Sequence, residues 1–160
     1  MEKINFRKAV DSDYSHILQL KRQVHEFHHA QRPDFYRTTK FPFEKTEFDN
    51  LINNKNSDIF IVEKDGIICG YAITKIIEFK DNPLVNNHKR LFIDDICIDN
   101  SFRKKGIGQF LMEKLELICK SDEFDYLDLN VWDFNTDAID FYKKTGMKEI
   151  MIRMEKKIIK

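Results

Sequence analysis

The chain has 160 residues, a length that suits a single domain. Hydrophobic residues make up 42% of the sequence and charged residues 34%, which is typical of a folded globular protein and excludes a disordered or fibrous chain. The 27 lysines and arginines balance 27 aspartates and glutamates, so the formal net charge is zero and predicts neither a nucleic-acid partner nor a membrane partner.

The sequence also bears on location and redox state. Residues 1–10 lack the apolar stretch of a signal peptide, and the longest apolar run, 67–73, is far shorter than the roughly 18 residues of a membrane span. We therefore expect a cytoplasmic protein. The three cysteines, Cys69, Cys97 and Cys119, are widely spaced in apolar stretches, which favours reduced core thiols over a disulfide or zinc framework.

The first half of the chain predicts short strands and helices. Ile4 and Phe6 alternate with polar residues in a first strand, and Asp11 is placed to cap a helix that runs to about Ala30. The Asp65-Gly66 dipeptide suits the positive φ angles of a tight hairpin turn. The other elements predicted in this half are a short helix at 48–52 and strands at 59–63 and 67–79.

The second half predicts alternating strands and helices. These are a strand at 91–98, a helix from 107 to 118, a strand at 126–132, a helix at 136–144 and a final strand at 147–156. The order of elements is typical of an α/β sandwich with a mixed sheet and covering helices. We find no linker, so we expect one domain over residues 1–160. Pairing between two copies through the final strand would make a homodimer, an alternative that the sequence leaves open.

A basic turn with two glycines lies between the strand at 91–98 and the next helix. Its residues are Arg103, Lys104, Lys105, Gly106, Ile107 and Gly108. Unpaired N–H groups and the positive end of the helix dipole form an anion site there, and glycine lets a phosphate reach the backbone. Dinucleotide and nucleoside-triphosphatase loops do not match, because Leu111 replaces the third glycine and no Gly-Lys-Ser/Thr follows. An exposed basic helix start without a ligand is the alternative.

A second group of residues follows at the next strand and helix. It comprises Leu127, Leu129, Asn130, Val131 and Trp132, then Asn135, Ala138 and the run Phe141-Tyr142-Lys143-Lys144-Thr145-Gly146-Met147. With the basic turn, this group resembles the GNAT superfamily of acetyl-CoA-dependent N-acetyltransferases over about residues 91–154. The resemblance implies a mixed central sheet that splays between the strands at 91–98 and 126–132, about four covering helices, acetyl-CoA as co-substrate and no metal.

The resemblance also implies where the coenzyme binds. A bulge in the strand at 91–98 would open the sheet for pantetheine, and the basic turn would wrap the pyrophosphate. The residues expected at the coenzyme are Ile96, Cys97, Ile98, Arg103, Lys104, Lys105, Gly106, Ile107, Gly108, Gln109, Asn130, Asn135 and Ala138. Asn135 is equally suited to cap a helix and Ala138 to pack against a neighbour.

The implied reaction is direct attack by a primary amine on the thioester in a ternary complex. Tyr142 matches the general acid of the family, because a neutral phenol can protonate the leaving thiolate. Asp94 is the first candidate for the base, while Asp95 or ordered water are alternatives, since a bulge can reverse strand register. For Tyr142 the alternative is a half-buried core residue beside Phe141.

The acceptor is expected near the first helix. In the family, the first two helices wall the acceptor pocket, so His28, His29, Arg32 and Tyr36 are candidate acceptor contacts, or else a solvated helix end and loop. The acceptor itself, a small molecule, a polyamine-like cation or a peptide amine, cannot be read from the sequence. Residues 122–140 hold seven acids and no Lys or Arg, which favours a cationic acceptor or forms a solvated rim.

Two other functions remain open at this stage. The domain could bind acyl-CoA as a sensor without catalysis. The run His25-Glu26-Phe27-His28-His29 also matches the H-E-x-x-H pattern of zinc metalloproteases, with His25 and His29 one helical turn apart. No third ligand follows in the sequence, because Arg32 and Phe35 occupy the positions of the longer zinc motif.

Overall fold

The structure, a computed structural model, describes residues 3–159. The strands are β1 (Ile4–Lys8), β2 (Ser57–Lys64), β3 (Ile67–Phe79), β4 (His88–Ile98) and β5 (Tyr126–Leu129). The helices are α1 (Tyr14–Gln31), α2 (Lys45–Ile52), α3 (Ile107–Ser121) and α4 (Thr136–Lys144), with short 3-10 helices η1 (Asp11–Asp13) and η2 (Asn100–Phe102). The chain forms two compact units, one ending at Asn130 and one beginning at Val131, and each is described by itself. One domain over residues 1–160 therefore stays a prediction.

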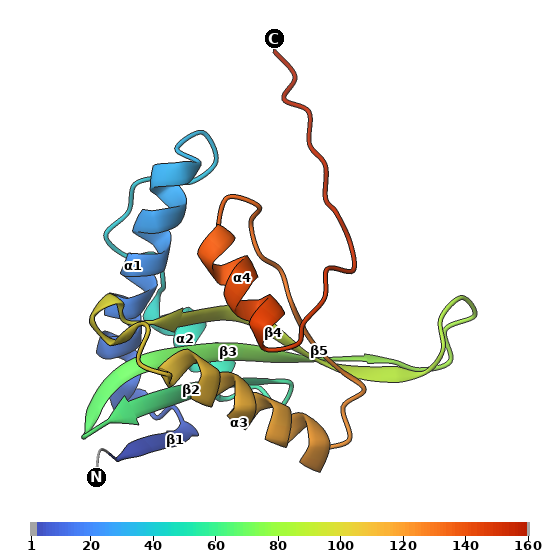
Figure 1. The fold of residues 1–160 in the computed structure, drawn as a ribbon, viewed down its shortest axis with the longest axis horizontal. Helices are drawn as coiled ribbons and strands as arrows, with labels where there is room; N and C mark the ends of the chain where they lie inside the picture. Colours follow the sequence, from blue (N-terminus) through green and yellow to red (C-terminus); the bar gives the residue numbers. More distant parts are fainter. Residues whose placement is uncertain (1–2, 160) are drawn as a thin grey trace. The chain divides into compact units, whose positions relative to one another are not determined.

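The five strands form one mixed sheet in the order β1-β2-β3-β4-β5 (Figure 1). The first four strands pair antiparallel, and β5 pairs parallel with β4. Together with the four α-helices, this confirms the predicted α/β class. No helix among residues 3–159 is long and apolar enough to cross a membrane.

Local sequence signals account for several boundaries. Asp65 and Gly66 have φ angles of 50° and 82°, so the hairpin between β2 and β3 turns as predicted. The predicted helix at 136–144 matches α4, which ends before Gly146 at φ 91°. Asp11 as the cap of the first helix is wrong. Asp11 lies within η1, and α1 begins after Asp13, which is 5% exposed and paired with an arginine of β1.

The helices α1 and α2 share a buried cluster with the middle strands. Its members are Ile17, Leu18, Leu20, Phe43, Phe48, Ile59, Ile61, Tyr71, Ile73 and Cys97. The helix α3 buries a separate stripe at helical spacing, made of Ile107, Leu111, Met112, Leu115 and Cys119. All three cysteines are buried and free, as predicted, and burial raises the pKa of the Cys97 thiol to about 12.

The predicted bulge lies in β4. Ile93 pairs with Thr74 while Asp95 pairs with the adjacent Ile73, so Asp94 is an extra residue on β4. The ladder to β5 then ends at the pair Ile93 and Leu129, although β4 runs on to Ile98. The strand predicted at 126–132 is therefore too long, because β5 stops where β4 bends away from regular register. Among the described residues, the last part of β4 pairs with β3 on one side and has no strand beside it on the other.

The final strand predicted at 147–156 is wrong. Residues 148–159 are all exposed and have no regular secondary structure. The alternation of apolar and polar side chains is present, but a strand also requires a neighbour to accept and donate backbone hydrogen bonds. No strand of the described sheet supplies that neighbour.

Candidate active site

The basic turn folds into the N-terminus of α3. Lys104 and Gly106 have positive φ angles of 58° and 79°, and Gly106 is the residue before the first helical position. A Cβ at position 106 would meet no atom within 4 Å, so it is the backbone angle that favours glycine there. The first bond of the helix runs from the Phe110 N–H to the Gly106 carbonyl at 3.0 Å. The three preceding N–H groups, of residues 107–109, lie at the positive end of α3.

Three cationic residues, Arg103, Lys104 and Lys105, come directly before these N–H groups in the chain. The Arg103 Nε donates to the Ile98 carbonyl at 3.0 Å, which ties the turn back to the end of β4. Lys104 and Lys105 are exposed, and the Lys105 ammonium lies 5.5 Å from the centroid of the Phe102 ring. Gln109, which was also predicted at the coenzyme, donates its side-chain amide to a glutamate one turn further on at 3.0 Å. The turn is thus an exposed cationic helix start suited to an anion.

The end of β4 leads directly into this turn. Ile96, Cys97 and Ile98 pair with β3 on one side only, opposite Ala72, Tyr71 and Gly70. Gly70 allows the close approach, because a Cβ there would lie 2.9 Å from the Cys97 carbonyl oxygen and 2.5 Å from the Ile98 Cδ1. On the other side the ladder with β5 has already ended. Backbone groups of residues 96–98 that point away from β3 are therefore placed to hydrogen bond with a ligand.

The two adjacent acids of β4 have different surroundings. Asp94, the first candidate for the base, is exposed and its Oδ2 lies 2.8 Å from the Lys75 Nζ. Asp95 is less accessible, with a side chain that is 19% exposed. Its Oδ2 accepts the Tyr71 hydroxyl at 2.8 Å and lies 2.8 Å from the Lys21 Nζ. The structure thus favours Asp95, the predicted rival, as the carboxylate held in a fixed position.

Lys21 and Tyr71 were not singled out from the sequence. Tyr71 is fully buried, and burial beside the Asp95 carboxylate raises its pKa well above the ordinary value, so the phenol stays protonated and donates a hydrogen bond to Asp95. Lys21 is 16% exposed at its side chain, with its ammonium 4.5 Å from the centroid of the Phe43 ring. The available signal was spacing, because position 21 lies on the same helical stripe as Ile17 and a charge on a buried stripe requires a partner.

The predicted acceptor residues gather at the end of α1. The rings of His28 and Tyr36 stack at 5.4 Å, and His25 meets the edge of Tyr36 at 5.9 Å. Burial lowers the pKa of His28, although the Asp95 carboxylate opposes this shift, so its imidazole is neutral near pH 7. Arg32 forms a bidentate pair with Asp34 at 2.9 and 3.0 Å. The acceptor role of these residues stays a prediction.

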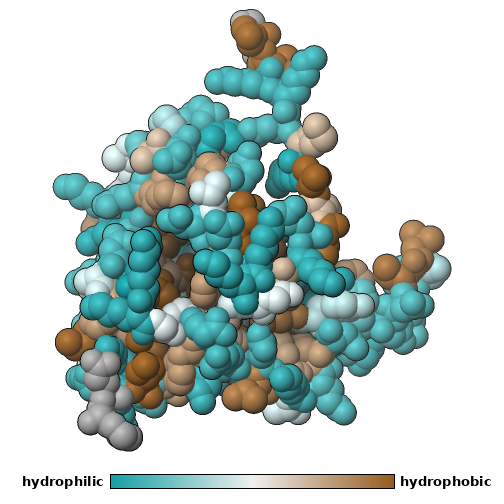
Figure 2. Space-filling model, viewed as in Figure 1, coloured by the Kyte–Doolittle hydropathy of each residue, from teal (hydrophilic) through white to brown (hydrophobic). Residues whose placement is uncertain are grey.

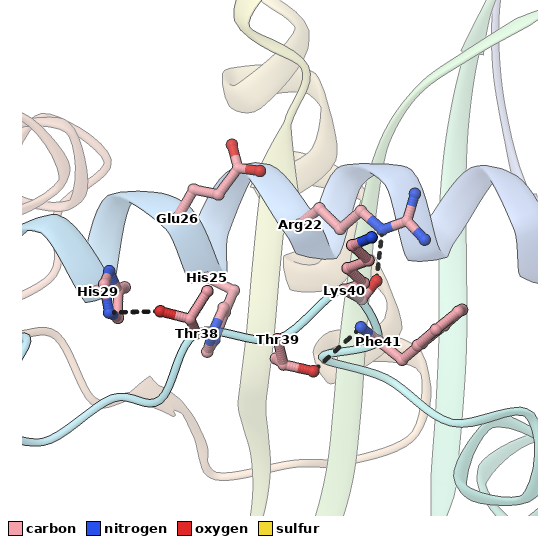
Figure 3. Close-up of a pocket in the computed structure, with 8 residues that line it drawn as sticks. All are labelled: Arg22, His25, Glu26, His29, Thr38, Thr39, Lys40 and Phe41. Carbon is pink, nitrogen blue, oxygen red and sulfur yellow. Dashed lines mark hydrogen bonds between the residues drawn. The ribbon is translucent and has the colours of Figure 1, made fainter.

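A pocket of about 500 Å³ lies between α1 and the loop that follows it (Figure 3). It is lined by Arg22, His25, Glu26, His29, Thr38, Thr39, Lys40 and Phe41. The Nε2 of His29 lies 3.2 Å from the Thr38 hydroxyl, and the Nε2 of His25 lies 2.7 Å from the Arg37 carbonyl. Figure 3 shows Glu26 pointing away from both histidines.

This arrangement does not support the metalloprotease interpretation. Among residues 3–159, no group of three or more His, Cys, Asp and Glu side chains is placed to hold a metal ion. The spacing of His25 and His29 reflects one face of α1, whose two imidazoles bond to the loop that closes over that face.

The second unit holds the other predicted residues. Tyr142 lies on α4, half-buried, with its ring centroid 5.4 Å from that of Phe141 in an edge-to-face contact. The Asn135 side chain accepts the Ala138 N–H at 3.4 Å, so it caps α4 as its alternative role predicted. Asn130, the last residue of the first unit, is exposed after β5. The coenzyme contacts of these residues stay predictions.

Comparisons with known proteins agree with this arrangement. The model of the acetyltransferase (GNAT) family matches residues 24–147. The L-amino acid N-acetyltransferase AaaT of Escherichia coli is 25% identical over 153 residues, which cover 92% of this chain and 85% of that protein. The L-ornithine N5-acetyltransferase NATA1 of Arabidopsis thaliana is 26% identical over 122 residues, and these cover 74% of this chain but only 50% of the relative.

A solved structure is similar over nearly the whole chain. It is a mutant form of the BH1408 protein from Bacillus halodurans, with a TM-score of 0.94 and 27% sequence identity. The match covers 97% of this chain and 99% of that one.

Proposed function

The chain belongs to the GNAT acetyltransferase family, and we propose that it transfers an acetyl group from acetyl-CoA to a primary amine by direct attack in a ternary complex. The observation that carries this proposal is the continuity of one segment. Within residues 95–109 the chain presents a fixed carboxylate, a strand edge that no other strand of residues 3–159 pairs with, and a cationic helix start, in that order. We also propose that residues 1–160 act as one functional domain.

The helix start and the strand edge would hold the donor. The dipole of one helix contributes only about 0.3–2 kcal/mol to binding an anion, so the N–H groups of residues 107–109 and the three cations of the turn must act together on the pyrophosphate. The free edge of residues 96–98 then offers backbone hydrogen bonds to the amide groups of pantetheine. This order directs the thioester toward Asp95, the residue just before that edge.

The acceptor must lose a proton before it attacks. An amine with a pKa near 10.4 is protonated at neutral pH, and its deprotonation costs about 4–5 kcal/mol. We assign Asp95 as the group that orients the ammonium and accepts its proton, directly or through water, because Tyr71 and Lys21 fix only its Oδ2. A neutral His28 adds no repulsion to an approaching cation. Tyr142 would return a proton to the sulfur, since a phenol is a neutral donor at this pH.

The acceptor class follows from the same charges. A half-buried carboxylate and a neutral imidazole favour a cationic primary amine over an anionic acceptor. Both relatives named above carry amino acids as acceptors in their names. We propose a small amino-acid-like or peptide amine as the acceptor.

The test is thiol release from acetyl-CoA with a panel of amino acids, polyamines and peptide N-termini. Gly108→Trp places a large side chain among the first N–H groups of α3 and should abolish coenzyme A binding in calorimetry. The matched control is Leu117→Trp, an exposed position on the same helix, which should bind coenzyme A as the unmodified protein does. Retained binding in Gly108→Trp would contradict the donor site. Binding without thiol release for any amine would favour the acyl-CoA sensor.

A further inference from the structure

One lysine of the chain is bound to the carboxylate that we assign as the base. The Lys21 ammonium lies 2.8 Å from Oδ2 of Asp95 and 4.5 Å from the centroid of the Phe43 ring. Position 21 comes one helical turn after the fully buried Ile17, so the side chain leaves α1 on the face that packs against the sheet. The carboxylate and the ring together hold a primary amine at Asp95.

This contact is the one that an acceptor must make. Under the function proposed above, the reacting amine gives a proton to Asp95 and lies near the thioester, which the strand edge at residues 96–98 directs toward the same carboxylate. Lys21 meets the first of these conditions in the structure. Its side chain is also a primary amine, and lysine amines attack carbonyl carbons in covalent catalysis. The acetyl donor therefore meets an amine that belongs to the protein itself.

We propose that the protein acetylates its own Lys21 when acetyl-CoA is bound and no other acceptor is present, an inference that rests on the proposed function. The Lys21 ammonium gives one proton to Asp95, from which it passes to water. The Nζ then forms a bond to the acetyl carbonyl carbon, the C–S bond of the thioester breaks, and the second proton leaves the nitrogen for the sulfur to give coenzyme A. The product is a neutral acetyllysine, which no longer pairs with Asp95 as a cation.

Exposure separates this reaction from chemical acetylation in solution. The side chain of Lys21 is 16% exposed, whereas those of Lys8 and Lys80 are 66% and 67% exposed. Figure 2 shows hydrophilic side chains over most of the face that it draws. Acetyl-CoA that reacts directly from solution should therefore modify exposed lysines first and Lys21 late. A donor bound in the site reverses this order, because it is held beside the amine.

Lys75 provides a matched control within the same chain. Its Nζ lies 2.8 Å from Oδ2 of Asp94, which is the distance in the pair of Lys21 with Asp95, one residue later on β4. The side chain of Lys75 is 45% exposed, so it is more accessible than Lys21 to a reagent in solution. A preference for Lys21 over Lys75 therefore reports the position of the amine at the assigned base, and not its pairing with a carboxylate.

The first test incubates the full chain with acetyl-CoA that carries a deuterated acetyl group, without an added amine, and follows each lysine by mass spectrometry of peptides. The deuterium distinguishes acetylation during the experiment from acetylation in the expression host. We expect Lys21 to gain label at least about tenfold faster than Lys75, with a rate constant that is independent of protein concentration. Equal rates at Lys21 and Lys75, or a rate constant that rises with protein concentration, would overturn the proposal.

The second test removes the bound donor. An excess of free coenzyme A competes for the donor site and should slow labelling of Lys21 but not of Lys75. Gly108→Trp should likewise lose the fast labelling of Lys21, whereas Leu117→Trp, at an exposed position on the same helix, should keep it. Labelling of Lys21 that is unchanged by coenzyme A or by Gly108→Trp would show a reaction from solution and contradict self-acetylation.

The outcomes distinguish this proposal from the function on which it rests. If the chain binds coenzyme A in calorimetry and releases thiol with an added amine, but Lys21 stays unlabelled, self-acetylation is wrong and the proposed function stands. If the chain binds no coenzyme A and Lys21 stays unlabelled, both are wrong.

Discussion

Replacement of Asp95 by asparagine tests the central assignment of the active site. The amide has the shape of the carboxylate and still accepts the Tyr71 hydroxyl, which lies 2.8 Å from Oδ2 in the unmodified protein. The variant loses the negative charge that faces Lys21 and the ability to accept a proton. General base catalysis contributes about 10²–10⁴ in rate, so we expect kcat at neutral pH to fall by about 10²–10³ with donor affinity unchanged.

The size of the defect should depend on pH. A side-chain amine with a pKa near 10.4 is unprotonated in roughly one molecule in 2,500 at pH 7, and this fraction rises about tenfold for each pH unit. If Asp95 acts by removing the proton of such a side-chain amine, the rate defect of Asp95→Asn should shrink about tenfold for each pH unit and nearly vanish near pH 10; for an α-amine, whose pKa is near 8, it should vanish about two pH units earlier. The measurement is thiol release at saturating acetyl-CoA across this range.

Asp94→Asn is the matched control, because it makes the same change one residue earlier on β4. Asp94 pairs with Lys75 at an exposed position, and exposed ion pairs contribute about 0–1 kcal/mol, so we expect kcat to change by less than about threefold. A larger defect in Asp94→Asn than in Asp95→Asn would restore Asp94 as the base. A defect of Asp95→Asn that is constant across pH would refute proton removal and leave Asp95 a structural role.

Two further predictions concern other parts of the chain. Tyr142→Phe removes only the hydroxyl and should lower kcat by about 10²–10³ at saturating donor; unchanged turnover at every pH would exclude the acid role. Arg7→Met should lower the melting temperature by roughly 5–10 °C, since Arg7 bonds the buried Asp13 at 2.7 and 3.0 Å and its loss costs about 2–3 kcal/mol. Burial alone raises the pKa of Asp13, but hydrogen bonds from Arg7 and the Val10 N–H outweigh it and leave the pKa below 3.8. This stabilisation is present above about pH 4 and is lost as the pH falls through the lowered pKa, so the difference between the melting curves should narrow in acid.

Signals contained within a few residues predicted structure well. The Asp65-Gly66 turn and the helix at 136–144 were found because backbone angles and helical spacing are local properties. Strands were harder to delimit. The ends of β5 and the absence of a strand at 147–156 depend on which backbone lies alongside, and alternation of side chains carries no information about that neighbour.

Some of the site residues could also be predicted from local sequence, whereas others depend on contacts between distant parts of the chain. The basic turn at 103–108 was readable because glycines and cations before a helix have a direct physical consequence. The sequence could not decide between Asp94 and Asp95 as the base, because that decision depends on the position of the bulge in β4. Lys21 was readable in principle as a charge on a buried helical stripe, but its partner lies more than seventy residues away in the sequence.

The bulge at Asp94 connects the fold with the proposed chemistry. If β4 kept the register of the Ile93 and Thr74 pair, Asp95 would lie opposite Ala72, on the other face of the sheet from Tyr71. The extra residue instead places Asp95 opposite Ile73, where its carboxylate reaches both Tyr71 and Lys21. The same irregularity coincides with the end of the β5 ladder, because a strand that bends away cannot stay parallel to its neighbour. One inserted residue therefore accounts both for the position of the carboxylate and for the open edge beside it.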